Sequence, residues 1–191
     1  MQMQALAIPE VKLLTPKKFG DDRGFFSETW SRKTLAALGI DADFVQDNHS
    51  LSRAKGVLRG LHFQTAPSAQ DKLVRVLRGS IFDVAVDIRR GSPTFGRHVS
   101  AVLSAVNWGQ LWVPRGFAHG FVTLEPDTEV AYKVTADYAP ECDRGLAWDD
   151  PALGILWPVP VAIDLLTAKD RKHPRLNDLP EYFTYAAARP I

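Results

Sequence analysis

The chain lacks three features, each typical of a large class of proteins: a pair of cysteines, a long apolar run and a strong net charge. Its 191 residues include one cysteine, Cys142, so no disulfide can form within the chain, which is typical of a reducing compartment. No apolar run approaches the ~18 residues of a membrane span. The formal net charge of +1 argues against the basic stripe of a nucleic-acid-binding protein, although it allows a local basic pocket. We therefore expect neither a membrane nor a nucleic acid as a partner.

The rest of the composition is that of an ordinary globular protein. Hydrophobic residues make up 46% of the chain and charged residues 24%, which is enough for a substantial core. No repeat, low-complexity region or linker divides the sequence, so we predict a single domain over residues 1–191. Residues 1–12 lack a basic stretch followed by a long apolar run. We therefore expect no signal peptide and a cytoplasmic protein.

Short runs of alternating apolar residues dominate the chain and predict strands. Residues 73–78 and 81–88 flank Gly79 and Ser80, which predicts a β-hairpin, and further runs cover 99–103, 111–113, 120–123 and 129–134. This spacing predicts an all-β sandwich, jelly roll or barrel. Helices are expected only over residues 31–38, between Ser31 as N-cap and Gly39 as stop, and near residues 167–171. The tail from Pro158 is expected to wrap the surface.

The segment GVLRGLHFQ at residues 56–64 places polar side chains in an apolar strand. A core strand has no use for Arg59 or His62, because burying an unpaired charge is costly, whereas a site for an anionic substrate uses both. Strict alternation puts these two side chains on opposite faces of the strand. Gly60 allows a bulge between them, which would turn both toward one cavity.

A second segment, WVPRGFAHGF at residues 112–121, carries His119. Its spacing resembles the second motif of the cupins, small β-barrels that often bind a metal. The first cupin motif normally supplies two histidines and a glutamate, but here that place holds only His62, followed by Phe63 and Gln64. A transition-metal site needs about three or four ligands, so we predict a barrel without a metal.

Without a metal, the chemistry must be acid–base. His62, with an ordinary pKa of about 6.5, suits a general base, and either Asp83 or Asp170 could orient it. Tyr132 could then be the acid, while Lys72 and Arg23 could hold negative charge on the substrate. Taken singly, such residues have commoner structural roles: a hydrogen-bonded core histidine, a half-buried strand tyrosine, and a solvated lysine or arginine.

Short motifs recur in a fixed order along about residues 8–180. They are GDDRGFF (20–26), FVQDNHS (44–50), GVLRGLHFQ (56–64), KLVR (72–75), FDVAVDIR (82–89), SPTFG (92–96), PRGFAHGF (114–121), YK (132–133), DRG (143–145) and KDR (169–171). Together they closely resemble the dTDP-4-dehydrorhamnose 3,5-epimerases, a family of metal-free cupins in deoxysugar biosynthesis. The resemblance implies a cupin-type jelly roll with a few short helices.

The resemblance also implies a role for individual residues. His62 would be the proton acceptor, and Asp170 its dyad partner. Tyr132 would be the proton donor on the opposite face of the sugar, and Lys72 would lie near the C4 oxygen of the substrate. Tyr138 would stack on the thymine, and Arg23 and Glu28 would reach in from the partner subunit of a homodimer. The implied substrate-binding set is Arg23, Glu28, Gln46, Asn48, Arg59, His119, Tyr138, Asp143 and Lys169.

The reaction implied by the resemblance converts dTDP-4-dehydro-6-deoxy-D-glucose to dTDP-4-dehydro-L-rhamnose by inverting C3 and C5. The C4 ketone makes both hydrogens acidic, so an acid and a base suffice and no cofactor is expected. Three alternatives stay open: a relative that inverts only C3 or only C5, a metal-dependent cupin oxygenase, and a sugar-nucleotide binding module without catalysis.

Overall fold

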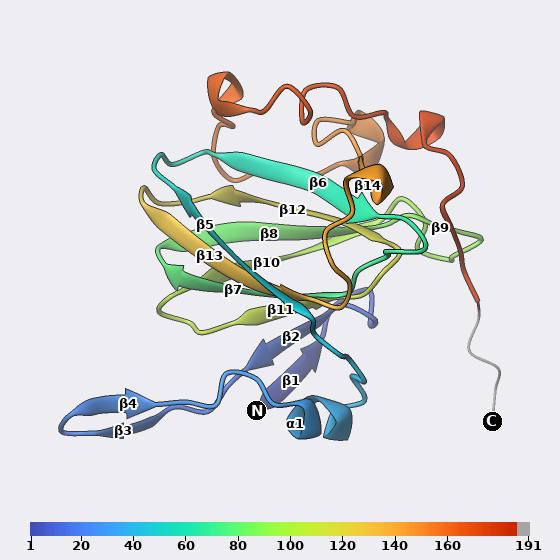
Figure 1. The fold of residues 1–191 in the computed structure, drawn as a ribbon. Helices are drawn as coiled ribbons and strands as arrows, with labels where there is room; N and C mark the ends of the chain where they lie inside the picture. Colours follow the sequence, from blue (N-terminus) through green and yellow to red (C-terminus); the bar gives the residue numbers. More distant parts are fainter. Residues whose placement is uncertain (187–191) are drawn as a thin grey trace.

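Two antiparallel β-sheets lie face to face and form the body of the protein (Figure 1). The structure, a computed structural model, describes residues 1–186. The all-β prediction is therefore confirmed for these residues, whereas the last five residues of the predicted domain 1–191 lie outside the described part. None of the helices in residues 1–186 is long and apolar enough to cross a membrane.

The larger sheet has six strands, all paired antiparallel. Its order is β1 (Gln2–Ala5), β2 (Lys12–Thr15), β11 (Gln110–Val113), β7 (Lys72–Arg78), β13 (Thr128–Val134) and β5 (Gln46–Ser52). The second sheet has five antiparallel strands. Its order is β10 (His98–Ser104), β8 (Ser80–Asp87), β12 (Phe117–Thr123), β6 (Leu58–Gln64) and β14 (Asp143–Gly145).

Apolar side chains from both sheets fill the space between them. The main cluster includes Val74 and Val130 from the larger sheet and Ile81, Ala85 and Phe121 from the smaller one, all at most 4% exposed. Two minor pairs complete the strands: the hairpin of β3 (Phe19–Asp21) with β4 (Gly24–Phe26), and the parallel pair of β9 (Arg89–Arg90) with β15 (Phe183–Thr184).

The predicted β-hairpin around Gly79 and Ser80 is wrong, although both of its strands exist. β7 pairs with β11 and β13, whereas β8 pairs with β10 and β12 in the other sheet. At Gly79 the chain crosses from one sheet to the other with φ +75°. β8 lies between β10 and β12 and is buried along almost its whole length. Its alternating sequence therefore predicted a strand but not the strand with which it pairs.

The helix predictions had opposite outcomes. The first is confirmed as α1 (Arg32–Ala37), where the side chain of Ser31 accepts the N–H of Thr34. The second is wrong, because residues 168–171 form a single turn. That turn closes with a hydrogen bond from Arg171 N to Thr167 O of 3.3 Å, and Pro174 follows too closely for a longer helix.

The tail after Pro158 covers β6 and the outer side of the smaller sheet, as predicted (orange to red in Figure 1). Ala162 N–H donates to Gly56 O at 2.8 Å, and Ala147 N–H donates to Pro174 O at 2.8 Å. Leu166, Leu176 and Leu179 of the tail are buried against the body of the protein. Short 3-10 helices punctuate it and the segment before it: Pro140–Cys142, Pro151–Leu153, Ile163–Leu165 and Leu176–Asp178.

The predicted bulge at Gly60 is present. Across β6 and β12, His62 pairs with His119 while Arg59 pairs with Phe121, so β6 holds one more residue than its partner between these pairs. The extra residue brings Arg59 and His62 onto the same cavity, as predicted. Gly60 is needed because its φ is +131° and because a Cβ there would lie 2.6 Å from Gly120 Cα.

Gly60→Ala is expected to lower the free energy of unfolding by about 3 kcal/mol or more, because it adds a backbone clash to an unfavourable φ. Gly91→Ala is the matched control, since Gly91 also has a positive φ of +80° but no atom within 4 Å of its Cβ position. It should cost about 1 kcal/mol. Urea denaturation of both variants makes the comparison, and equal losses would contradict the close approach of β6 to β12.

Candidate functional site

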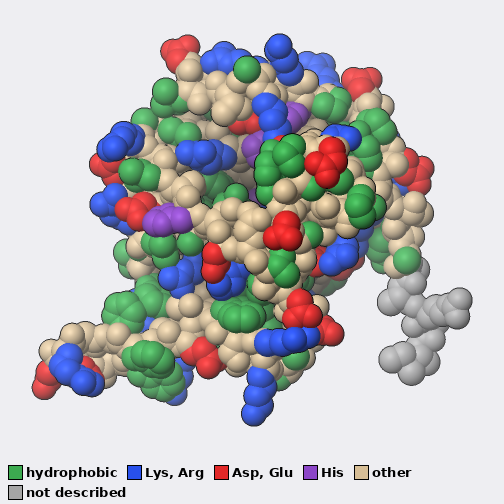
Figure 2. Space-filling view, viewed as in Figure 1, with side chains coloured by type: hydrophobic (Ala, Val, Ile, Leu, Met, Phe, Trp, Pro, Cys, Tyr) green, Lys and Arg blue, Asp and Glu red, His purple; other side chains and the backbone are tan. Residues whose placement is uncertain are grey.

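A polar cavity of about 460 Å³ opens between the two sheets beneath the tail. Both sheets and the turn at 167–172 contribute to its wall. Figure 2 shows histidine and basic side chains around a hollow on this face of the molecule. The polar side chains that line the cavity are Ser50, Arg59, His62, Lys72, His119, Tyr132, Thr167, Lys169 and Asp170.

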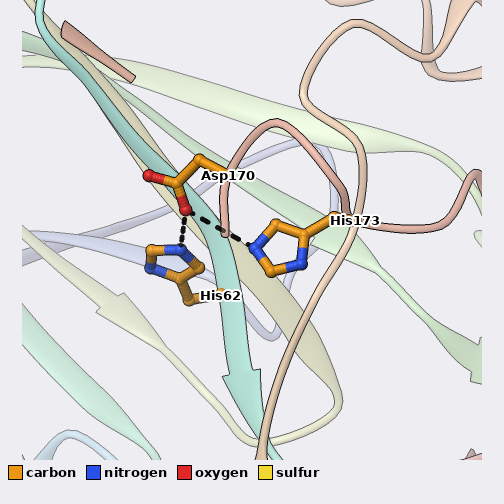
Figure 3. A group of neighbouring side chains, drawn as sticks. All are labelled: His62, Asp170 and His173. Carbon is orange, nitrogen blue, oxygen red and sulfur yellow. Dashed lines mark hydrogen bonds and ion pairs between the residues drawn. The ribbon is translucent and has the colours of Figure 1, made fainter. Parts of the chain in front are cut away.

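His62 and Asp170 form the closest polar pair in this cavity. Nε2 of His62 lies 2.5 Å from Oδ1 of Asp170, which is almost fully buried (Figure 3). The turn that carries Asp170 is fixed because the backbone N–H of Asp170 donates to Oγ1 of Thr167 at 3.1 Å. Of the two carboxylates that the sequence offered to His62, the structure therefore selects Asp170.

The surroundings set the protonation of this pair. Burial lowers the pKa of His62, while Asp170 opposes the shift and the charges of Lys72 and Lys169 add to it. Burial by itself would raise the pKa of Asp170, but the nearby imidazole of His173 and the hydrogen bond with His62 outweigh it and hold that pKa well below its usual range. His62 is thus neutral at neutral pH, with an ionised carboxylate beside it.

Lys72 is the first residue of β7 and is buried. Its Nζ donates to the carbonyl oxygen of His62 at 3.2 Å, which ties the larger sheet to the smaller one. Burial lowers the pKa of Lys72 to about 8, although Asp143 and Asp83 partly offset the effect. Lys72 therefore carries a positive charge into the cavity below about pH 8.

Tyr132 lies on β13 of the larger sheet and packs against the main core cluster. His62 belongs to the smaller sheet, so the phenol and the imidazole face the same cavity from opposite sheets. Burial raises the pKa of Tyr132, with Arg59 opposing the shift. The phenol is consequently protonated at neutral pH and available as a proton donor.

His119 and Asp83 form a second pair in the same cavity wall. Nε2 of His119 lies 2.6 Å from Oδ1 of Asp83, and both side chains are buried. Oδ2 of Asp83 has no hydrogen-bond partner within residues 1–186. Arg59 is held differently, because its Nε donates to Oγ of Ser52 at 3.1 Å and its Nη2 to the carbonyl oxygen of Leu51 at 3.2 Å.

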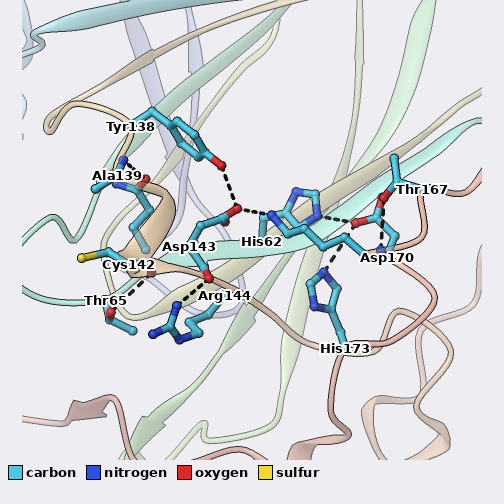
Figure 4. A network of polar contacts seen from close by, with 12 residues as sticks. His62, Thr65, Tyr138, Ala139, Cys142, Asp143, Arg144, Thr167, Asp170 and His173 are labelled. Carbon is cyan, nitrogen blue, oxygen red and sulfur yellow. Dashed lines mark hydrogen bonds and ion pairs between the residues drawn. The ribbon is translucent and has the colours of Figure 1, made fainter.

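A smaller cavity of about 200 Å³ adjoins the first and shares His62, Lys72, Tyr132 and Lys169 with it. Its remaining walls include four residues predicted to bind substrate: Gln46, Asn48, Tyr138 and Asp143. Figure 4 shows Asp143 between Tyr138 and the dyad, where it accepts from Tyr138 Oη at 3.3 Å and pairs with Lys169. Tyr138 is otherwise exposed.

Arg23 and Glu28 are not brought to the cavity within one chain. Arg23 lies at the tip of the β3–β4 hairpin, which projects from the body as an arm (Figure 1), and pairs there with Asp21 at 2.5 Å. Glu28 accepts a hydrogen bond from Oγ1 of Thr34 at 3.0 Å. Neither residue lines the two cavities, and the role in a partner subunit that the resemblance implied stays a prediction.

Sequence reasoning missed His173. Its Nε2 lies 3.5 Å from Oδ1 of Asp170, so two histidines flank one carboxylate oxygen (Figure 3). The side-chain nitrogen and oxygen atoms of His62, Asp170 and His173 that could bind a metal ion lie within 4.8 Å of one another. The only signal in the sequence was the spacing of three residues between Asp170 and His173, which places both side chains on one side of a turn.

Comparison with known proteins gives the context for this geometry. The family model described as dTDP-4-dehydrorhamnose 3,5-epimerase matches residues 5–178. The dTDP-4-dehydrorhamnose 3,5-epimerase of Sinorhizobium fredii is 57% identical over 97% of this chain and 94% of its own length. The chain belongs to this family. The predicted membership is therefore confirmed.

Solved structures of the family share the fold. The enzyme of Legionella pneumophila, in complex with dTDP-4-keto-L-rhamnose, superimposes with a TM-score of 0.91 at 46% identity and covers 97% of this chain and 99% of its own. A 3'-monoepimerase of Streptomyces bikiniensis, in complex with dTDP-quinovose, gives a TM-score of 0.83 at 32% identity over 92% of this chain and 88% of its own. These likenesses confirm the cupin-type jelly roll.

Asp170→Asn is expected to lower the pKa of His62 further, because it removes the carboxylate charge that favours the imidazolium form. Titration of the imidazole signals by NMR measures this directly. Asp83→Asn serves as the control, because Asp83 pairs with His119 and should leave the titration of His62 in place. A His62 titration that both variants leave unchanged would disprove the electrostatic coupling of the dyad.

Proposed function

We propose that this chain epimerises dTDP-4-dehydro-6-deoxy-D-glucose at C3 and C5 to dTDP-4-dehydro-L-rhamnose, a step of dTDP-rhamnose biosynthesis. The observation that carries the proposal is the placement of a neutral imidazole and a neutral phenol on opposite sheets of one cavity. His62 and Tyr132 can thus address the two faces of one sugar ring. A module that merely binds nucleotide has no need for a matched base and acid.

In the proposed mechanism, His62 removes a proton from the carbon next to the C4 ketone. Asp170 keeps the imidazole oriented and stabilises the imidazolium that forms. The electron pair of the broken C–H bond moves into an enolate, and its negative charge develops on the C4 oxygen. Tyr132 then returns a proton from the opposite face, so the configuration at that carbon inverts.

Lys72 meets the charge of the enolate in this scheme. A buried ammonium fixed by a hydrogen bond needs no reorganisation when the charge develops, so it stabilises the transition state more than the ketone. Its pKa of about 8 also limits the working range, because deprotonation above that value removes the positive charge. The reaction requires no redox cofactor and no metal, since each step is a proton transfer.

The remaining predicted residues would hold the nucleotide and the sugar. Arg59 and His119 line the sugar cavity, and we assign them to substrate binding there. Around the adjoining cavity, Tyr138 would stack on the thymine, with the polar groups of Gln46, Asn48, Asp143 and Lys169 near the rest of the nucleotide.

We further propose a homodimer in which each arm supplies Arg23 and Glu28 to the partner's site. The arm exposes three aromatic side chains, which a partner would cover: Phe19, Phe25 and Phe26. The arginine at its tip would meet the pyrophosphate, for which a planar cation is well suited. We propose that the chain works as one domain, and its cytoplasmic location stays a prediction from sequence.

Incubation with the substrate in deuterated buffer is expected to place label at both C3 and C5 of the product, as read by NMR. Label at one carbon only would replace the proposal by a monoepimerase, the activity named for the Streptomyces bikiniensis relative. His62→Ala is the matched control: it should abolish labelling at both carbons while dTDP still binds in calorimetry. Near-normal labelling in that variant would overturn the assignment of the base.

The shared site can be tested by mixing two inactive variants, His62→Ala and Arg23→Ala. If Arg23 acts across the interface, each mixed dimer holds one intact site, and refolding the variants together should restore about a quarter of the wild-type activity. Each variant refolded alone is the control and should stay inactive. No recovery in a mixture that demonstrably forms mixed dimers would mean that Arg23 serves its own chain.

A further inference from the structure

His173 occupies a place built for its ring. A Cβ on Gly145 would lie 2.3 Å from both Cε1 and Nε2 of His173, so the imidazole lies directly on the backbone of β14. Gly145 is the cross-strand partner of His62. The side chain of His173 is 8% exposed, and its ring meets that of His62 edge to face, with centroids 5.5 Å apart. The fold therefore buries a second imidazole beside the first.

Within residues 1–186, the polar contact of Nε2 of His173 is with the dyad carboxylate. The distance of 3.5 Å to Oδ1 of Asp170 is long for a hydrogen bond, and Nε2 has no closer partner within residues 1–186. Figure 3 shows both rings directed at this one oxygen. His173 lines neither the sugar cavity nor the adjoining one, so any effect that it has on the substrate passes through the dyad of His62 and Asp170.

A metal ion fits this cluster poorly. Tetrahedral zinc with Zn–N bonds of about 2.0–2.1 Å keeps its ligand atoms about 3.3 Å apart, whereas His62 and Asp170 are 2.5 Å apart. Lys72 and Lys169 also direct positive charge at His62, which opposes a divalent cation. The arrangement suits shared hydrogen bonds to the carboxylate better than coordination.

We infer that His173 is a positioning residue for the catalytic dyad: its Nε2–H donates to Oδ1 of Asp170, fixes the carboxylate and weakens its pull on the proton of His62. The inference rests on the proposed role of His62 as the base. In that role His62 must hold a proton briefly and then release it. If Asp170 accepted a hydrogen bond from His62 alone, its negative charge would stabilise the imidazolium form of His62 more strongly, and His62 would release its proton less readily.

The sign of the pH effect follows from this sharing. Without the donor on His173, Asp170 favours the imidazolium form of His62 more strongly, so the pKa of His62 rises. The acid limb of the kcat/KM profile then moves to higher pH, because only neutral His62 accepts a proton. Within residues 1–186, the other titratable groups that share a cavity wall with His62 are Arg59, Lys72, His119, Tyr132, Tyr138, Asp143 and Lys169. Those that share one with His173 are Asp143, Arg144, Lys169, Lys172 and Tyr182.

Two variants of similar size separate positioning from packing. His173→Gln keeps an N–H near the place of Nε2, whereas His173→Phe keeps a flat ring over Gly145 without a donor. For His173→Phe we expect kcat to fall about tenfold with little change in KM, and the acid limb to move to higher pH. His173→Gln should restore most of kcat and return the limb toward that of the wild type.

Equal profiles for the two variants, or an acid limb that stays in place or moves to lower pH, would overturn the inference. So would one equivalent of zinc bound by the wild type and lost in both variants, since the cluster would then be a metal site. NMR titration of His62 in the same proteins needs no substrate. It therefore tests the role of His173 even if the wild type proves not to be an epimerase.

Gly145 offers an independent route to the same contact. Gly145→Ala should displace the ring of His173 and move the titration of His62 in the direction expected for His173→Phe. In a His173→Ala background no ring remains to be displaced, so the same change should have no further effect on the titration. Additive effects of the two substitutions would contradict a path through His173.

Discussion

The hydrogen bond between His62 and Asp170 joins residues 108 positions apart and gives the cavity its chemistry. One partner lies on a central strand and the other in a turn of the tail that crosses over it. The contacts that hold this turn, including the buried leucines of the tail and its backbone hydrogen bonds to Gly56 and Ala147, therefore also help to orient the base. The carboxylate of Asp170 therefore links the packing of the tail to the basicity of His62.

Burial determines which titratable groups in the cavity are neutral and which are ionised. Burial makes every ionised group less favourable, so a base and an acid stay neutral there without further help. Two buried groups stay ionised: Lys72 retains its proton below about pH 8 because two carboxylates offset part of the cost, and Asp170 stays ionised beside His62. A fixed cation close to two neutral proton carriers is the electrostatic arrangement that an enolate intermediate requires.

Sequence reasoning recovered what depends on local pattern. It located the strands over residues 99–103, 111–113, 120–123 and 129–134, the capped helix after Ser31, and the bulge at Gly60, because each leaves a signature within a few residues. It failed where partners are chosen over distance. The sequence around Gly79 is the same whether the strand after it pairs with the strand before it or enters the other sheet, as β8 does.

The residues of the site also differ in whether the local sequence identifies them. His62 was recognisable as an unusual residue in its own strand, but its pairing with Asp170 rather than Asp83 came from the resemblance and then from geometry. His173 could not be recognised from the sequence, because nothing in the polar tail around it indicates that its side chain is buried against Gly145.

The order of the chain has a consequence for how the protein matures. During synthesis from the N-terminus, the strand that carries His62 is made long before the turn that carries Asp170. Until that turn is made, the imidazole lacks the carboxylate that orients it. The group that completes the dyad is therefore among the last to be made, and a chain interrupted before the tail would lack it.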